Sequence, residues 1–290
     1  MTGPAAGRTV VVAGGAGAVG ALLARSWTGD GASVVAVDVR DGPGGDIRRP
    51  PPPVQRLIRS ADVLVLAVPE GVALAAAASV APLLRPGSVL VETLSVKSRF
   101  ADRVDSLPWG DGVAVLGINP MFAPSLAMPG RPVAAVIHRG GGAADTVLAE
   151  LRSWGARVRP TTADRHDRVC AAMQALTHAA VLSFGLALAD LGVDADETAA
   201  LAPPPFAVLS ALLARITGGT AEVYRDVQVA NPGAAAAREA LARAVSRLSA
   251  AAAADPGDFA GLLADAGAPL ADHAAGYADL CARLFEGTVR

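Results

Sequence analysis

A run of glycines near the N-terminus carries the clearest chemical signal. The β-branched run at residues 10–12 is followed by Gly14, Gly15, Ala16, Gly17, Ala18, Val19 and Gly20, and apolar residues at helical spacing continue from there. A glycine turn between a strand and a helix leaves backbone N–H groups free to bind an anion. Gly15 is expected to allow the tight turn, Gly17 the approach of a pyrophosphate, and Gly20 the close packing of helix on strand. We therefore predict a phosphate cradle at residues 15–20.

An acidic residue, Asp38, ends the next predicted strand, at residues 33–37. It follows the last glycine by about 20 residues, the distance at which a carboxylate accepts hydrogen bonds from a ribose diol and repels a 2′-phosphate. The pattern favours NAD over NADP, although Arg40 could weaken that preference. A third buried strand, predicted at residues 62–68, ends at Val68 and is followed by Pro69, and both residues are expected to lie where the chain turns over the same cofactor. The alternative is a glycine-rich loop in an unrelated α/β protein.

A second set of polar side chains suits an acidic substrate. The set comprises Ser95, Lys97, Asn119, His178, Arg215 and Tyr224. A guanidinium can hold a carboxylate through two parallel hydrogen bonds, and an ammonium can balance a negative charge. By residue type alone each has an ordinary alternative, such as a turn serine, a solvated lysine, a core histidine or a cation that ends a helix.

Two patterns of apolar spacing divide the chain. Before residue 160, strands are predicted at 10–12, 33–37, 62–68, 88–91, 113–116, 133–137 and 156–159, with helices between several of them and a proline-rich surface loop at 41–53. Beyond residue 160, helices are predicted at 163–189, 205–216, 234–252 and 259–285. We predict an α/β Rossmann-type domain at 1–160, then an all-α substrate and dimerisation domain at 161–290, with substrate in the cleft between them.

Composition argues against several partners and sites. The net charge of −2 gives no overall attraction to nucleic acid or to an anionic membrane. Cys170 and Cys281 match no metal or redox spacing, so no metal is expected. No signal-peptide pattern is visible, which favours the cytoplasm. Residues 169–189 lack charge and are long enough to cross a bilayer, but they include Gln174 and His178, so we expect a buried interdomain or subunit-interface helix.

Six stretches form a distinctive series between residue 9 and about residue 232. They are VVVAGGAGAVG, ADVLVLAVP, LVETLSVKS, LGINPMFAPS, RHDRVCAAMQALTHAAVLSFG and ARITGGTAEVYRDVQVANP. In these stretches the chain resembles the prephenate and arogenate dehydrogenases, including the 4-amino-4-deoxyprephenate dehydrogenases. The resemblance implies an oxidative decarboxylation, in which a hydride leaves C4 of a cyclohexadienyl ring for NAD and the ring carboxylate leaves as CO2.

The resemblance also implies roles for individual residues. Ser95 would bond to the C4 substituent or help to place the nicotinamide. His178 would lie on the substrate side, and Arg215 would hold a carboxylate of the dicarboxylate substrate with Tyr224 nearby. Lys97 could balance the charge of that substrate.

Other matching residues are interpreted as structural. His166 and Asp167 correspond to an HD pair of the family, which we expect to orient the interdomain helix. Asp226 and Asn231 are interpreted as capping or packing residues.

Asn119 departs from the family pattern. Prephenate dehydrogenases of this pattern carry a histidine there, which serves as the base for the C4 hydroxyl. An asparagine amide cannot take a proton, but its oxygen can accept a hydrogen bond from an amine. We therefore expect nitrogen at C4, as in 4-amino-4-deoxyprephenate, with 4-aminophenylpyruvate, a secondary-metabolite precursor, as product. Prephenate or arogenate is the alternative substrate.

Two further functions compete with this one. β-Hydroxyacid dehydrogenases use a lysine on the interdomain helix, and the helix predicted here has no lysine. An imine reductase would not explain the SVK motif at 95–97 or the NPMF motif at 119–122. An NAD-binding sensor or inactive paralogue would explain the lost histidine, but Ser95, His178 and Arg215 all remain. The apolar helical domain predicts a homodimer through its C-terminal helices.

Overall fold

The computed structural model describes residues 5–41 and 45–287, and it divides the chain into two compact units. The first unit ends at Cys170 and the second begins at Ala171. The boundary falls later than residue 160 because helix α6 (Ala163–Cys170) packs on the first unit, where its Asp167 accepts hydrogen bonds from the backbone N–H groups of Lys97 and Ser98.

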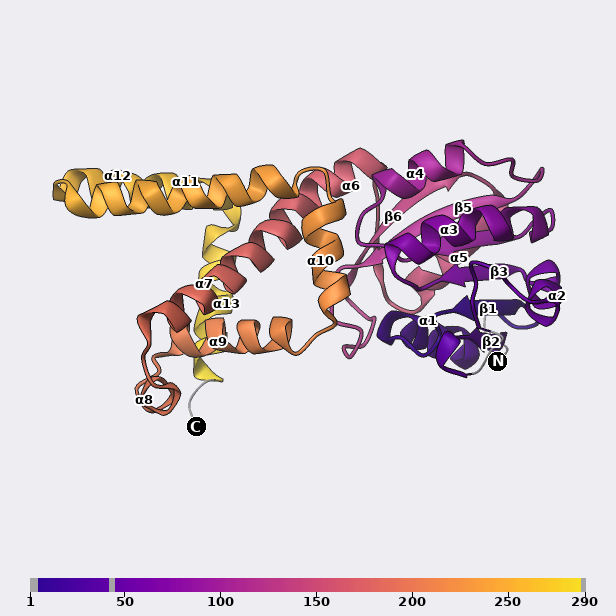
Figure 1. Ribbon diagram of the computed structural model, residues 1–290, viewed down its shortest axis with the longest axis horizontal. Coiled ribbons are helices and arrows are strands. Elements are labelled where there is room, and N and C mark those ends of the chain that lie inside the picture. The colour runs from indigo at the N-terminus through magenta and orange to yellow at the C-terminus, as the bar shows by residue number, and fades with distance from the viewer. Residues whose placement is uncertain (1–4, 42–44, 288–290) are drawn as a thin grey trace. The chain divides into compact units, whose positions relative to one another are not determined.

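The first unit is built on a seven-stranded sheet (Figure 1). The strands are β1 (Thr9–Ala13), β2 (Ser33–Val37), β3 (Val63–Leu66), β4 (Val89–Glu92), β5 (Ala114–Pro120), β6 (Pro132–Arg139) and β7 (Arg157–Pro160). Their order is β2-β1-β3-β4-β5-β6-β7, and only the β5–β6 pair is antiparallel among the described strands. The prediction of an α/β doubly wound domain is confirmed, with a strand at each predicted place.

Helices cover both faces of this sheet. They are α1 (Ala18–Gly29), α2 (Pro52–Ser60), α3 (Glu70–Val80), α4 (Ser98–Asp105) and α5 (Gly142–Ser153), with α6 following β7. Successive residues of β1 point to opposite faces, so Val10 and Val12 pack with α1 and α5 while Val11 and Ala13 pack with α2, α3 and α4. Burying both faces in this way explains the near-continuous apolar strands of the sequence.

Three details of the first unit differ from the prediction. Helix α2 begins inside the segment predicted to be a loop, because proline is tolerated in the first helical turn and Val54 and Ile58 share one buried face. Helix α4 was not predicted. Strand β5 runs on to Pro120, so Asn119 lies in the sheet and not in the loop that follows it.

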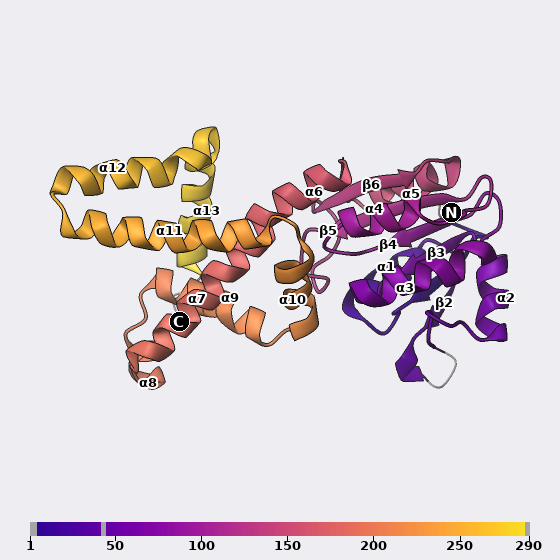
Figure 2. The same ribbon diagram turned by 45° about the horizontal axis from the view of Figure 1, so that its top comes forward.

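The second unit is entirely helical in its described residues (Figure 2). A π-helical segment (Ala171–Leu176) continues α6 into α7 (Thr177–Leu191), and the later helices are α8 (Ala195–Ala200), α9 (Pro204–Thr217), α10 (Ala221–Ala230), α11 (Ala234–Ala253), α12 (Pro256–Gly267) and α13 (Ala274–Glu286). The helix predicted at 259–285 is interrupted by a 3-10 segment at Ala268–His273. Helices α8 and α10 were not predicted, although Asp194 caps α8 through the N–H groups of Asp196 and Glu197.

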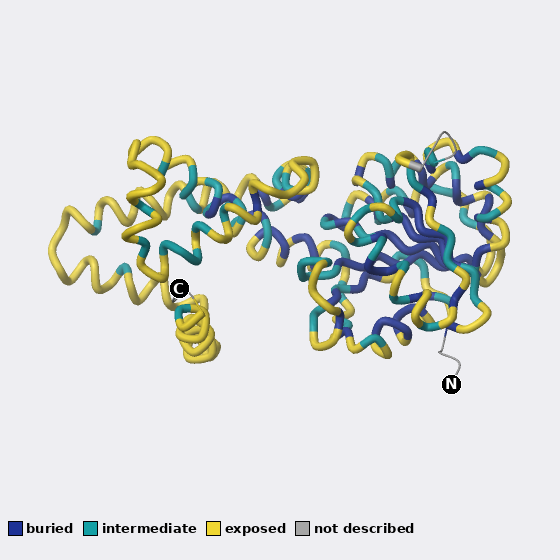
Figure 3. Tube along the Cα trace, turned by 90° about the horizontal axis from the view of Figure 1, so that it is seen from below, coloured by how far each residue is buried: buried dark blue, intermediate teal, exposed yellow. Residues whose placement is uncertain are grey.

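Burial differs sharply between the units (Figure 3). Within the described part of the second unit, Ala175, Val227 and Ala234 form the one buried apolar cluster. The continuous helix Ala163–Leu191 is long and apolar enough to cross a membrane by length and composition, and 28% of its most apolar window is buried. The burial that we predicted for this helix is therefore not reached within one chain.

Candidate active site

The glycine turn is the most tightly constrained part of the site. Gly14 has a φ of +81°, its N–H donates to the Val37 carbonyl at 2.8 Å, and a Cβ on it would lie 2.1 Å from the Ala67 carbonyl oxygen. Gly14 therefore takes the left-handed conformation at the start of the turn. Gly15, which was predicted to allow the turn, lies inside it, because the N–H of Gly17 donates to the Gly14 carbonyl at 2.9 Å, and it also gives room to Ala36, whose Cβ would lie 2.6 Å from a Cβ at position 15.

The other two glycines lie where the turn meets α1. A Cβ on Gly20 would lie 2.2 Å from the Gly14 carbonyl oxygen, which confirms that Gly20 permits close packing. Gly17 is the N-cap of α1 and provides no side chain to bond the first N–H groups of the helix. Ala18, Val19 and Gly20 form that first turn, so an anion can reach it as the cradle requires.

The predicted ribose acceptor lies beside this turn. The Asp38 carboxylate accepts hydrogen bonds from the N–H of Ala16 at 3.2 Å and from the N–H of Arg40 at 3.1 Å. On the other side, the side chain of Val68 packs against Gly14, and Pro69 is the N-cap of α3. These residues follow β1, β2 and β3, where the strand order reverses and open α/β sheets bind ligands. The geometry fits a dinucleotide.

Lys97 does not lie in solvent. Its side chain is fully buried, and its ammonium donates to both oxygens of Glu92, at 2.9 and 2.8 Å, and to the Ile118 carbonyl at 2.8 Å. An ammonium has three N–H donors, and all three are used here. The predictions that Lys97 binds substrate or is solvated are therefore corrected: it joins the end of β4 to β5, next to Asn119.

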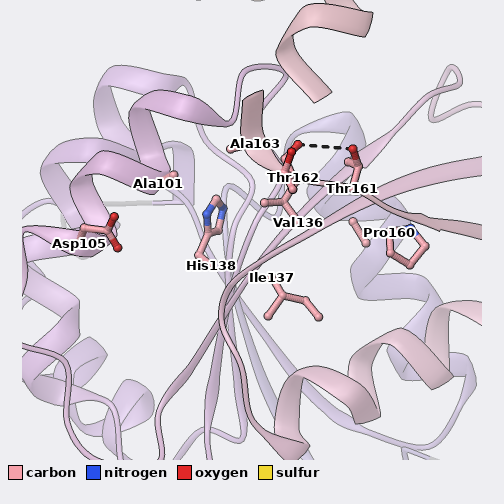
Figure 4. A pocket seen from close by; sticks show the side chains of 10 residues that line it. Ala101, Asp105, Val136, Ile137, His138, Pro160, Thr161, Thr162 and Ala163 are labelled. Carbon is pink, nitrogen blue, oxygen red and sulfur yellow. Dashed lines mark hydrogen bonds between the residues drawn. The ribbon is translucent and has the colours of Figure 1, made fainter. Parts of the chain in front are cut away.

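Glu92 is the centre of this buried group. His138 on β6 lies 3.1 Å from Glu92 Oε1, and the N–H of Leu94 donates to Oε2. Burial raises the pKa of Glu92, but the charge of Lys97 and the hydrogen bond from His138 outweigh it, so the pKa falls below its usual value. His138 also lines a cavity of about 290 Å³ between α4, β6 and the start of α6 (Figure 4). None of the predicted site residues lines that cavity.

Asn119 belongs to a second buried group. Its Nδ2 lies 3.1 Å from Nε2 of His166, and His166 Nδ1 lies 2.8 Å from the Asp167 carboxylate. The same carboxylate accepts from the N–H groups of Lys97 and Ser98, so it fixes the segment that carries the half-buried Ser95. These contacts agree with the expectation that Asp167 holds α6 in place. The contact of His166 with Asn119 was not foreseen.

The second unit gathers the residues predicted to bind substrate. His178 on α7 and Tyr224 on α10 pack edge to face, with ring centroids 5.0 Å apart. Burial lowers the pKa of His178, and the charge of Arg215 at the end of α9 lowers it further. Among the described residues, His178 Nδ1 and Gln174 Oε1 are buried without a hydrogen-bond partner. Buried polar atoms without a partner are uncommon, and a bound ligand or water would satisfy them.

Three contributors were missed by sequence reasoning: Glu92, His138 and Gln174. Glu92 ends an apolar strand, and a charged residue in that place is a signal that could have been used. His138 gives no such signal, because its partner comes from another strand. Gln174 lies one helical turn before His178, so the spacing alone could have paired them.

Comparison with known proteins gives consistent matches. The family model "Prephenate dehydrogenase, dimerization domain" matches residues 162–262. The 4-amino-4-deoxyprephenate dehydrogenase of Streptomyces pristinaespiralis is 49% identical over 291 residues, which cover 96% of each chain.

Solved structures agree with this fold. Prephenate dehydrogenase from Aquifex aeolicus superposes with a TM-score of 0.66 at 16% identity, covering 90% of this chain and 98% of that one. A structure from the same organism in complex with hydroxyphenyl propionate and NAD+ gives a TM-score of 0.64 at 17% identity, covering 83% and 88%.

Proposed function

Because this chain belongs to the prephenate dehydrogenase family, we propose that it oxidises 4-amino-4-deoxyprephenate to 4-aminophenylpyruvate. NAD+ accepts the hydride from C4, the ring carboxylate leaves as CO2, and the ring becomes aromatic. The near-full-length similarity to the Streptomyces pristinaespiralis enzyme carries this proposal, and Asn119 supports it. The chain would act in the cytoplasm.

The first unit would bind the cofactor, which supplies the hydride acceptor. The N–H groups at the start of α1 would hold its pyrophosphate, and Asp38 would accept hydrogen bonds from a ribose. Val68 and Pro69 would line the same place. Ser95 would bond to the C4 substituent or to the nicotinamide.

Asn119 would distinguish the two possible C4 groups. Its amide nitrogen is engaged by His166, which leaves the amide oxygen to accept a hydrogen bond from a substrate amine. The nitrogen lone pair of that amine would drive hydride loss without a base. The lone pairs of a C4 hydroxyl are weaker electron donors unless a base removes its proton, and Asn119 is unable to act as that base.

The second unit would hold the acidic groups of the substrate. The planar guanidinium of Arg215 would donate two parallel hydrogen bonds to a carboxylate. His178 and Gln174 have buried polar atoms without hydrogen-bond partners, and these would bind the substrate. Tyr224 would pack beside His178 and keep its ring in place.

We also propose that two copies of the chain associate through the second unit. Large apolar side chains are exposed there, among them Leu263, Leu280 and Leu284. Patches of this kind on a folded protein are typical of an interface. The family model that matches this region is described as a dimerization domain.

The assay is direct. Purified protein is given NAD+ and either 4-amino-4-deoxyprephenate or prephenate, and NADH formation is followed by absorbance. We expect the amino compound to give the higher kcat/KM. Rapid turnover of prephenate with none of the amino compound would reject the proposed substrate. Binding of NAD+ without any NADH from either compound would instead indicate a sensor.

The Asn119→His variant tests whether the missing base determines the choice of substrate. It supplies a base and is expected to raise kcat/KM for prephenate by about 10²-fold or more, the range of general-base catalysis. The matched control is Asn119→Ala, which removes the amide without adding a base and should bring no gain with prephenate.

Arg215→Ala tests the second unit. Loss of a charge-assisted hydrogen bond is expected to raise KM about 10- to 100-fold, equivalent to about 1.5–3 kcal/mol. Arg243, exposed on α11, provides the control substitution Arg243→Ala, which should leave KM unchanged.

A further inference from the structure

Asp167 determines where the proton of His166 lies. The carboxylate accepts hydrogen bonds from His166 Nδ1, Lys97 N and Ser98 N, each at 2.8 Å. Burial raises the pKa of Asp167, but these hydrogen bonds outweigh that effect and leave the pKa below its usual value. An ionised carboxylate can only accept, so Nδ1 of His166 carries the proton.

Two donors meet the other ring nitrogen of His166. Nδ2 of Asn119 lies 3.1 Å from Nε2, and Sγ of Cys170 lies 3.5 Å from it. Burial raises the pKa of Cys170 to about 11, so its sulfur carries a proton and can donate. Neutral histidine has one donor nitrogen and one acceptor nitrogen. With Nδ1 protonated, Nε2 is the acceptor.

This arrangement sets the direction of the Asn119 amide. Because Nε2 accepts, the amide must turn its nitrogen toward His166, and its oxygen is left for another partner. If Nε2 carried the proton, the amide would turn around and present its NH2 group. An amide oxygen suits an amine donor, whereas an amide NH2 group suits an oxygen acceptor.

We propose that His166 and Asp167 are positioning residues that give the site its preference for nitrogen over oxygen at C4, by holding the Asn119 amide in one orientation. The inference rests on the proposed function and deepens it. Neither residue touches the substrate. They act through Asn119, from helix α6 to strand β5.

The tautomer can be measured without any turnover. The full-length protein, labelled with 15N in its histidines, is examined by NMR with NAD+ bound, and the His166 signals are identified by their loss in His166→Phe. We expect Nδ1 to carry the proton and Nε2 to be bare. A proton on Nε2 would overturn the inference whether or not the protein is an active dehydrogenase.

The selectivity is tested with Asp167→Asn. The new amide is uncharged and has one acceptor oxygen for the three donors that bond to Asp167, so it holds the proton on Nδ1 less firmly and no longer fixes the Asn119 amide in one orientation. The ratio of kcat/KM for the amino compound over prephenate should fall about tenfold, the value of one hydrogen bond of about 1.4 kcal/mol. The Kd for NAD+ should change by no more than about twofold, because the substitution alters the hydrogen bonds of residue 167 and leaves the glycine turn unchanged.

The matched control is Asp164→Asn, the same chemical change on an exposed residue of the same helix, which should leave the ratio unchanged. If Asp167→Asn does not fold, judged by tryptophan fluorescence, His166→Phe is used instead, because it frees the amide to rotate and should also lower the ratio. Equal losses with both substrates would mean a merely structural role and would overturn the inference. Wild-type protein inactive with both substrates would reject the proposed function, while the NMR result would still decide the tautomer.

Discussion

The two units of this chain differ in how far they bury their apolar side chains and pair their buried polar groups. The first buries both faces of its sheet, and its ionic side chains Glu92, Lys97 and Asp167 are buried with partners. The second leaves large apolar side chains exposed in its described residues, and its buried polar atoms on Gln174 and His178 are unpartnered. The first unit has large apolar cores on both faces of its sheet. The second has groups that a ligand or a second copy would satisfy.

The two units can be followed separately because they contain different aromatic chromophores. All three tryptophans, Trp27, Trp109 and Trp154, lie in the first unit, and both tyrosines, Tyr224 and Tyr277, lie in the second. Tryptophan fluorescence therefore reports the first unit alone. Far-UV circular dichroism reports the helices of both.

The largest effect is expected from Lys97→Met. The substitution leaves the Glu92 carboxylate buried without its ammonium, and breaking a buried ion pair in this way destabilises a protein by about 3–5 kcal/mol. Urea unfolding followed by tryptophan fluorescence measures the change in the free energy of unfolding. A change below about 1 kcal/mol, typical of exposed pairs, would mean that the pair does not stabilise the first unit.

A somewhat smaller effect is expected from Leu284→Asp in the second unit. Burial of a leucine side chain in an interface contributes about 1.5–3 kcal/mol, so the proposed dimer should dissociate at micromolar concentration. Light scattering gives the mass, and tryptophan fluorescence should not change. Val39→Asp, at an exposed apolar residue of the first unit, is the control and should leave the mass unaltered. Dimers that persist in Leu284→Asp would place the interface elsewhere.

Acid should weaken the first unit gradually. Glu92 and Asp167 have pKa values below their usual ones, so the unfolded chain binds protons more tightly than the folded one. Their contribution is therefore present above about pH 4, the ordinary carboxyl range, and is lost as pH falls through their lower native values. Urea midpoints from tryptophan fluorescence between pH 7 and pH 3 test this. A constant midpoint would contradict it, and Glu92→Gln should remove part of the dependence.

The smallest effect is expected from Arg247→Met, the counterpart of Lys97→Met. Arg247 pairs with Asp265 at 2.7 Å, but both side chains are largely exposed. Solvent screens such a pair, so the free energy of unfolding should change by about 1 kcal/mol or less. Unfolding followed by circular dichroism measures it. A loss of unfolding free energy as large as that of Lys97→Met would show that the buried and the exposed ion pair contribute equally to stability.

Much of the fold was predictable because its signals are local. Apolar β-branched runs marked the strands, and a glycine run with Asp38 behind it marked the dinucleotide site. The helices that were missed had weaker local signals. Helix α2 begins in a proline cluster, and α4 depends on the burial of Phe100 and Val104 against the sheet.

For the predicted substrate-binding residues of the second unit, proximity was easier to predict than individual contacts. Arg215, His178 and Tyr224 were expected together, and the structure places His178 against Tyr224 and under the influence of Arg215. The burial of Lys97 was not predicted, because a single lysine is usually solvated. Its partner Glu92 is five residues away, yet the backbone must turn at the end of β4 before the two can meet.

The sequence by itself determined the seven strands in their order along the chain, the glycine run and the unusual asparagine, because each can be recognised from residues that are neighbours in the chain. Only the tertiary structure decided that Gly14 takes a positive φ, that Lys97 is buried, and that His166 faces Asn119. Those facts depend on groups from different strands and helices, and a charge or a hydrogen bond acquires its partner only when the chain has folded.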